Sequence, residues 1–183
     1  MPDATPPAAD LESLVALFFS DAGELAEFES VDEDSCPAAY RSLLAHSAHM
    51  TVTVERRHTS PVDVVVVREK KTQTHYSRVI LLRRQSDGRV VQFGIVRLAL
   101  NTLQPDVRSE ILSGKIPLGR VLIQHNVMRQ VQLLGLWRVH CGAELARLLD
   151  CSIGQETYGR SALIFCDCEP AVELLEIVAP EGL

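Results

Sequence analysis

The sequence lacks the features of a membrane-spanning or nucleic-acid-binding protein. None of its apolar runs approaches the roughly 20 residues that a membrane-spanning helix needs. Its formal net charge of −6 argues against nucleic acid or an anionic membrane surface as the main partner. Residues 1–10 have no basic stretch and do not resemble a signal peptide. We therefore expect a cytoplasmic protein, without a membrane span, that does not bind nucleic acid; the sequence leaves its oligomeric state open.

The sequence also has no clear pattern of metal ligands. Its five cysteines are odd in number, and Cys166 and Cys168 are too close together for a zinc knuckle. We expect buried, reduced thiols, with a reversible disulfide or weak metal binding at these two residues as the alternative. His46 and His49 lie three residues apart on a predicted helix, without a third ligand nearby. The solvated end of a helix explains these two histidines better than a metal site.

The chain is long enough, at 183 residues with 46% of them hydrophobic, for one domain with a sizeable core. We expect residues 1–9 to form a disordered tail and residues 10–183 to form the domain. Apolar residues at helical spacing predict helices at 10–19, 37–49, 105–113 and 143–149. Alternating or β-branched runs predict extended chain or strands at 50–54, 62–67, 74–84, 90–100, 127–140, 158–166 and 171–179. Hairpins dominate this order, so the sequence predicts an α+β fold with a largely antiparallel sheet.

Three segments carry more specific expectations. Residues 24–34 are acidic and are expected to form a surface connection. The residues SDGR at 86–89 predict a hairpin turn. The strand at 127–140 should have one solvent-facing side, because polar residues alternate with apolar ones. The apolar residues assigned to its inner side are Val127, Val131, Leu133, Trp137 and Val139.

The stretch GKIPLGR at 114–120 predicts a junction between two helices. Gly114 should end the first helix in the left-handed conformation, and Pro117 suits the start of the second. The amides of Leu118 and Gly119 would then lack an intrahelical acceptor, so they could bind a carboxylate. The alternative is a corner between helices that only turns the chain.

Arg78 is the first candidate for chemistry. It shares a strand face with Ile80 and Leu82, where an unpaired guanidinium is costly to bury. The strand pattern therefore indicates an anionic partner. That partner could be a ligand, or an acidic residue in a structural ion pair.

Glu176 is the second candidate. It shares a strand face with Leu174 and Val178, and a carboxylate among apolar side chains can exchange a proton near neutral pH. Glu173 lies on the other face of the same strand. The alternation alone does not choose between the two glutamates, and either could be a surface residue on an edge strand.

With these residues in place, the chain resembles the chorismate pyruvate-lyase family, which makes 4-hydroxybenzoate. The residues HYSRVILL at 75–82, followed by SDG at 86–88, are similar to the arginine-bearing strand and hairpin of that family. The stretch at 114–120 is similar to its most recognisable motif, and EIVAP at 176–180 to its closing strand. The resemblance runs from about residue 40 to residue 180.

The resemblance implies a six-stranded antiparallel sheet with helices on one side and helical flaps over a buried pocket. It implies an enzyme that eliminates pyruvate from chorismate, without a metal or an organic cofactor. Arg78 and the backbone amides of Met50 and Leu118 would hold the ring carboxylate, and Glu176 would be the general acid or base. The substrate-binding residues implied are thus Met50, Arg78, Leu118 and Glu176, with Arg78 and Glu176 catalytic.

The chain departs from better-known members of the family in two places. Residues 141–154 carry a predicted helix that some members lack, where a flap would form. The connection before Glu176 is about one residue longer, which keeps Glu173 as an alternative. A second function also stays open, since the effector domains of some transcription regulators resemble this fold and bind small molecules. Such domains normally follow a helix-turn-helix, and residues 1–50 contain no basic recognition helix.

Overall fold

The computed structural model describes residues 10–181, so the predicted tail at 1–9 lies outside the described residues. The helices are α1 (Leu11–Ala16), α2 (Ala22–Leu25), α3 (Ala38–Leu44), α4 (Met50–His58), α5 (Pro105–Leu112), α6 (Leu118–Gln124) and α7 (Ala143–Leu149). The strands are β1 (Ala26–Val31), β2 (Val62–Lys71), β3 (His75–Arg84), β4 (Val90–Ala99), β5 (Arg129–Cys141), β6 (Glu156–Cys166) and β7 (Glu169–Val178). Within the described range, no helix is long and apolar enough to cross a membrane.

All the strands join one antiparallel sheet in the order β1-β5-β6-β7-β4-β3-β2. This confirms the α+β class and the antiparallel sheet. The sheet has seven strands instead of the expected six, because the acidic segment predicted as a surface connection contains edge strand β1. Residues 26–31 pair with residues 136–141 of β5, and Glu29 forms an ion pair with Arg138 at 2.9 Å.

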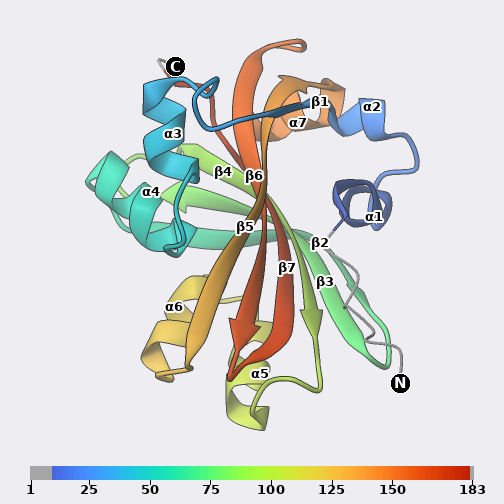
Figure 1. Ribbon diagram of the computed structural model, residues 1–183, viewed down its shortest axis with the longest axis vertical. Helices are drawn as coiled ribbons and strands as arrows, with labels where there is room; N and C mark the ends of the chain where they lie inside the picture. The colour runs from blue at the N-terminus through green and yellow to red at the C-terminus, as the bar shows by residue number, and fades with distance from the viewer. Residues whose placement is uncertain (1–9, 182–183) are drawn as a thin grey trace.

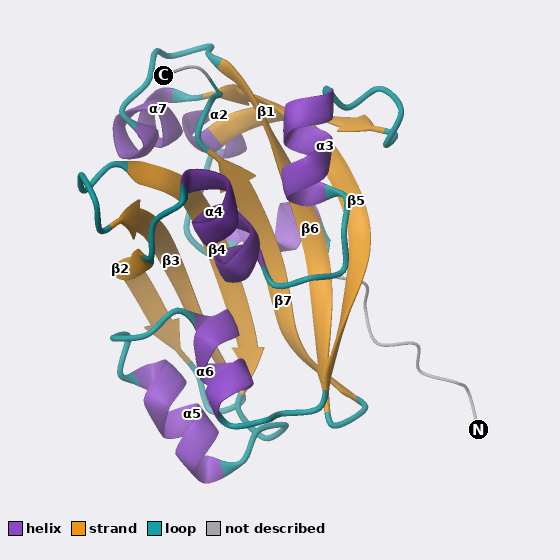
Figure 2. Cartoon of the chain, turned by 90° about the vertical axis from the view of Figure 1, so that its left-hand side faces the viewer, coloured by secondary structure: helices purple, strands orange, loops and turns teal. Residues whose placement is uncertain are grey.

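Helices cover both faces of the sheet, although the resemblance implied one side only (Figure 1). We call the face under α3, α4, α5 and α6 the pocket face, and the face under α1, α2 and α7 the packing face. Figure 2 shows the four helices of the pocket face in front of the strands. Strand β3 explains how both faces become apolar: Ile80 and Leu82 join the core of the pocket face, while Val79 and Leu81 join the other.

The segment predicted as extended at 50–54 is instead the first half of α4. Met50, Thr51 and Val54 are buried on one side of this helix, which packs against α3, α6 and β3. Val and Thr are less favourable in a helix than Ala by only a few tenths of a kcal/mol per residue, about 0.7 at most. Burial of the apolar side of the helix outweighs this cost. The predicted helix at 37–49 ends early, with α3 at Leu44.

Strand β5 does not keep one solvent-facing side along its length. The pairing with β6 shifts register between Leu133 and Gly135. Such a bulge exchanges the faces of the residues that follow it. Val131 therefore packs in the core of the pocket face, whereas Trp137 and Val139 pack on the packing face.

Helix α7 is not a flap over the pocket, as the position of residues 141–154 had suggested. It packs against α2, β4 and β5. Its apolar side, including Leu145 and Leu149, belongs to the core of the packing face. The resemblance placed this helix on the wrong side of the sheet.

Candidate functional site

A pocket lies between the pocket face of the sheet and the beginnings of α4 and α6. Strands β3, β4, β6 and β7 supply much of its floor, and residues 49–51 and 117–119 close it from above. The cavity is small, about 40 Å³, which is room for only a few water molecules. Its walls are mainly apolar, and they carry an unusual set of charged and polar side chains.

All four residues implied as substrate-binding line this one pocket: Met50, Arg78, Leu118 and Glu176. Arg78 comes from β3, Glu176 from β7, and the other two from the first positions of α4 and α6. Glu173, the alternative to Glu176, points to the packing face and binds Arg97 of β4, with Arg97 Nη2 2.6 Å from Glu173 Oε1. The structure thus places Glu176, and not Glu173, together with Arg78.

Arg78 is a buried cation without an anionic partner. Arg78 is only 1% exposed. Its Nη1 donates a hydrogen bond to the carbonyl of Ile111 at 3.1 Å. Its Nε has no hydrogen-bond partner, and no carboxylate of residues 10–181 lies within 4.0 Å of the guanidinium. Burial lowers the pKa of Arg78, and the nearby Tyr76 and Glu69 side chains oppose this effect.

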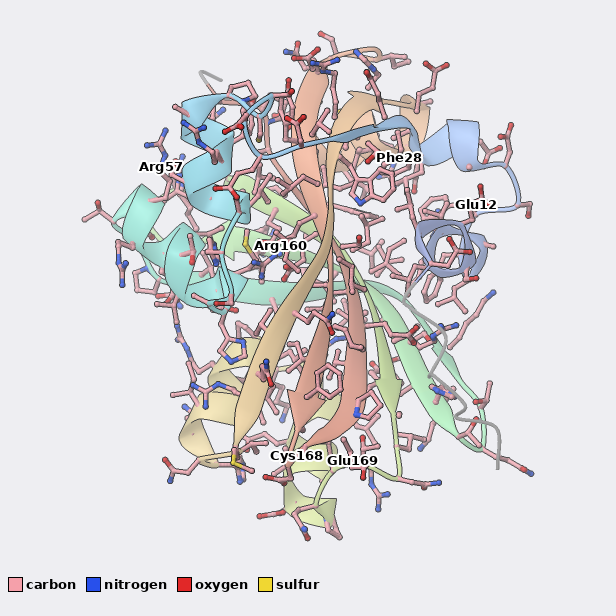
Figure 3. The ribbon with its side chains drawn as sticks, viewed as in Figure 1. Glu12, Phe28, Arg57, Arg160, Cys168 and Glu169 are labelled. Atoms are coloured by element: carbon pink, nitrogen blue, oxygen red, sulfur yellow. The ribbon has the colours of Figure 1, made fainter. Side chains whose placement is uncertain are left out.

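Glu176 is held by a second arginine that the sequence analysis did not identify. Arg160 Nε donates to Glu176 Oε2 at 2.7 Å, and both residues are buried. Arg160 also donates to the carbonyls of His46, at 2.8 Å, and Ala48, at 3.2 Å. Figure 3 shows Arg160 on the side of the sheet that faces α4. The signal was present in the sequence, because alternation on β6 puts Arg160 on the same face as Ala162.

The two helices over the pocket begin next to each other. Leu118 is the first residue of α6, with Pro117 as its N-cap and no side chain capping the helix. Gly114, at φ +68°, turns the chain after α5 as the sequence predicted. A Cβ atom on Gly119 would lie only 3.2 Å from Thr51 Oγ1 and from the Cβ of His49, so the absence of a side chain lets the two helix starts meet closely. Within the described range, the amides of Leu118 and Gly119 donate to no protein acceptor.

The two histidines do not lie on a helix but in the loop between α3 and α4. Burial of the two rings lowers the pKa values of His46 and His49, and the positive charge of the nearby Arg160 adds to this effect. For His49 burial is the largest cause, Arg129 the next, and its pKa falls to about 4. Residues 10–181 contain no group of three side chains able to hold a metal ion.

The cysteines are all unpaired, and most are buried. Cys36, Cys141 and Cys166 are buried, Cys151 is partly buried, and Cys168 is exposed. Burial is the main cause that raises the pKa of Cys166, to about 11. Cys168, in the turn between β6 and β7, is therefore the accessible thiol of the described chain.

Comparisons with known proteins identify the fold. No family model and no curated protein matches the chain. Among solved structures, the effector domain of PhnF from Mycobacterium smegmatis matches with a TM-score of 0.53 and 10% identity, over 74% of this chain and 90% of that domain. In the PhnF structure itself the match has a TM-score of 0.52 and 10% identity, over 74% of this chain and 65% of PhnF. The C-terminal domain of the histidine utilization repressor from Pseudomonas syringae pv. tomato str. DC3000 matches at 10% identity with a TM-score of 0.47, over 67% of this chain and 94% of that one. The described chain thus has the fold of the PhnF effector domain.

Proposed function

We propose that this chain is a small-molecule-binding domain whose ligand is a carboxylate held by Arg78. The observation that carries the proposal is the buried Arg78 guanidinium without an anion beside it. Leaving a charged group buried and unpaired is strongly unfavourable. A bound anion removes that cost, so the pocket favours an anionic ligand over a neutral one. The fold shared with a domain named as an effector domain supports a binding role.

The free edge of Arg78 suits a carboxylate. Nη1 is occupied by the carbonyl of Ile111, whereas Nε has no partner and lies with Nη2 on one edge of the guanidinium. Two parallel N–H groups match the two oxygens of a carboxylate, and such charge-assisted pairs are about twice as strong as neutral hydrogen bonds. The amides at the start of α6 add donors with the positive end of a helix dipole behind them. Apolar side chains such as Ile80 and Val131 would surround the rest of the ligand.

Binding requires the pocket to open. The cavity of about 40 Å³ is far below the roughly 150 Å³ that accommodates a benzene ring. The covering segments, 49–51 and 117–119, are single turns at the beginnings of short helices, whereas the floor is a hydrogen-bonded sheet. The helices α4 and α6 therefore act as the flaps, and they move away from the sheet to admit the ligand.

Calorimetric titration with 4-hydroxybenzoate tests this proposal. We expect measurable binding to the unmodified chain, and a loss of at least about 30-fold, roughly 2 kcal/mol, in the variant Arg78→Met. Arg97→Met is the matched control, because Arg97 lies on the neighbouring strand but binds Glu173 on the packing face. Equal affinity in folded Arg78→Met and in the unmodified chain would assign Arg78 a structural role.

The second candidate is the lyase reaction itself, and the observation that favours it is the presence of Glu176 in the same pocket as Arg78. The ring carboxylate of chorismate would bind Arg78. The bond between the ring carbon and the ether oxygen breaks and leaves its electron pair on the oxygen. The neighbouring ring carbon, which carries the hydroxyl group, loses its hydrogen as a proton, and the C–H electron pair completes the aromatic ring. The departing enolpyruvate takes up a proton at its methylene carbon and becomes pyruvate. The products are pyruvate and 4-hydroxybenzoate. Glu176, fixed by Arg160, would take or give the proton.

An assay with chorismate distinguishes binding from catalysis. If the chain is a lyase, it forms pyruvate and 4-hydroxybenzoate without added metal, and Glu176→Gln slows single turnovers on the order of 10²-fold or more. Glu173→Gln is the control, since that carboxylate lies on the packing face. Binding of 4-hydroxybenzoate without pyruvate formation would leave the binding function and remove the catalytic one.

A further inference from the structure

The pocket floor contains a second polar side chain with an unpaired buried atom. Gln92 of β4 is 2% exposed and lines the same pocket as Arg78. Its Oε1 is buried and makes no hydrogen bond, and its Nε2 makes none with residues 10–181. Exchanging the amide oxygen and nitrogen would leave an unpaired donor instead of an unpaired acceptor. In either orientation, the amide needs a partner that the described chain does not supply.

The unpaired amide indicates a ligand more than a structural role. Leu82 and Val178 flank Gln92 on the two neighbouring strands, where a leucine of similar size would fill the space without a buried polar group. An unpaired buried amide destabilises the folded chain. Among the side chains that the structure describes, two buried nitrogen or oxygen atoms lack a partner, Arg78 Nε and Gln92 Oε1. Both belong to this one pocket.

The sheet register places these two groups at opposite ends of the pocket floor. On β3 and β4, Arg78 is opposite Val96, and Leu82 is opposite Gln92. The two polar residues are therefore about four residues apart, roughly 13 Å along the strands. Glu176 is opposite Gly94, halfway between them. A ligand with its carboxylate on Arg78 would extend along the strands toward Gln92.

We propose that Gln92 selects the ligand by accepting a hydrogen bond from a hydroxyl group at the end opposite the carboxylate. The ligand class is then a hydroxy acid with its two polar groups at opposite ends. This inference rests on the proposed binding function and makes it narrower. A hydroxyl group on Gln92 Oε1 satisfies the acceptor that the chain leaves unpaired. A ligand without the hydroxyl leaves it unpaired and binds less well.

A comparison of two ligands in two variants tests the role of Gln92. Calorimetry with 4-hydroxybenzoate and with benzoate gives the preference for the hydroxyl group as a ratio of dissociation constants. We expect a preference of about tenfold in the unmodified chain and none in Gln92→Leu. The change should come from weaker binding of 4-hydroxybenzoate, with benzoate unaffected or tighter. Gln132→Leu, the same change at an exposed position of β5, should keep the full preference.

The outcomes separate the two proposals. If both acids bind and Gln92→Leu keeps the preference for 4-hydroxybenzoate, the assignment of Gln92 is wrong and the binding function stands. If neither acid binds the unmodified chain, the binding function fails and the assignment fails with it. Thermal unfolding without ligand gives an independent check, and we expect Gln92→Leu, or Gln92→Met if that variant does not fold, to melt at a higher temperature. A lower melting temperature in both variants would mean that the amide has a structural partner, against the proposal.

Discussion

The two faces of the central sheet bury similar apolar residues but very different polar ones. On the packing face, the buried polar side chains of the strands are small hydroxyls, such as Ser77 and Ser161. Ser161 Oγ accepts a hydrogen bond from Trp137 Nε1 at 3.1 Å. The strands of the pocket face bury two guanidinium groups, one carboxylate and one amide: Arg78, Arg160, Glu176 and Gln92. One face is built as a core, and the other combines a core with the proposed binding pocket.

This difference teaches that burial has opposite meanings on the two faces. A buried apolar residue of the packing face stabilises the fold because it leaves water and fills space. A buried charge stabilises only where a partner compensates its lost hydration. On the pocket face Arg160 has such a partner in Glu176, whereas Arg78 has none in residues 10–181. Substitutions should therefore change stability by different amounts, and with different signs, at matched positions.

The largest expected effect is the loss of a large side chain from the packing face. Phe93 of β4 is fully buried there. Phe93→Ala should lower the free energy of unfolding by about 3–5 kcal/mol, since it removes apolar contacts and leaves a cavity. Urea denaturation measures this change. The affinity for 4-hydroxybenzoate, measured where the variant is fully folded, should stay within about twofold of the unmodified value, and a larger loss would mean that the two faces are not independent.

The next effect is the loss of the partner of Glu176. Arg160→Met leaves a buried carboxylate unpaired and frees the carbonyls of His46 and Ala48. We expect a loss of at least about 3 kcal/mol of unfolding free energy in urea. The double variant Arg160→Met with Glu176→Leu should recover most of the lost unfolding free energy, because the unpaired carboxylate has been removed as well. A double variant as unstable as the single one would show that Arg160 stabilises the loop through the carbonyls instead.

The same substitution at Arg78 should act in the opposite direction. Arg78→Met removes a buried cation that has no anion beside it, so the free energy of unfolding should rise by about 1–3 kcal/mol while ligand binding is lost. The carbonyl of Ile111 keeps a donor, since the amide of Gly114 lies 3.2 Å away. Urea denaturation of Arg78→Met beside Arg97→Met measures the contrast. A fall in the stability of Arg78→Met would mean that Arg78 stabilises the fold of the free chain.

Much of the fold could be predicted from the sequence because its signals are local. The hairpin from β3 to β4 follows from SDGR at 86–89, and Gly88 has the positive φ that this turn needs, at +73°. The helix before Gly114 was predicted almost to its ends. The α4 helix was missed because its stability comes from burial between the sheet and α6, which overrides the preference of a β-branched run. Strand β1 was missed because its acidic residues face solvent on a sheet edge.

The candidate site was predicted in part because alternation along a strand is also a local signal. Alternation along a strand assigns Arg78 and Glu176 to apolar faces, and the structure brings both into one pocket. The same argument, applied to β6 and β4, would have found Arg160 and Gln92. The pattern of a single strand does not indicate which strands pair with each other or in which register. The ion pair of Arg160 with Glu176, and the lack of one at Arg78, depend on sheet register between segments far apart in the chain.

The smallest expected effect is a pH dependence of folding stability that comes from His49 at the rim of the pocket. His49 is partly buried and accepts a hydrogen bond from Arg129 Nε, which only a neutral imidazole can do. Burial and the two arginines, Arg129 and Arg160, lower its pKa to about 4 from the value of 6.5 expected in an unfolded chain. Between these pH values the unfolded chain binds a proton that the folded chain does not. The contribution of His49 to folding is therefore complete above pH 6.5 and is lost as the pH falls toward 4.

We therefore predict that His49→Asn is less sensitive to acid than the unmodified chain. From pH 7 to pH 5 its unfolding free energy should fall by about 1 kcal/mol less, a modest value because solvent screens a partly exposed side chain. Urea denaturation at the two pH values measures the difference. Arg129→Met should reduce this acid sensitivity by a smaller amount than His49→Asn, since it removes one cause of the lowered pKa of His49 and leaves the ring buried. Identical pH profiles for His49→Asn and the unmodified chain would show that His49 is solvated in the folded state, and that the segment before α4 already opens without a ligand.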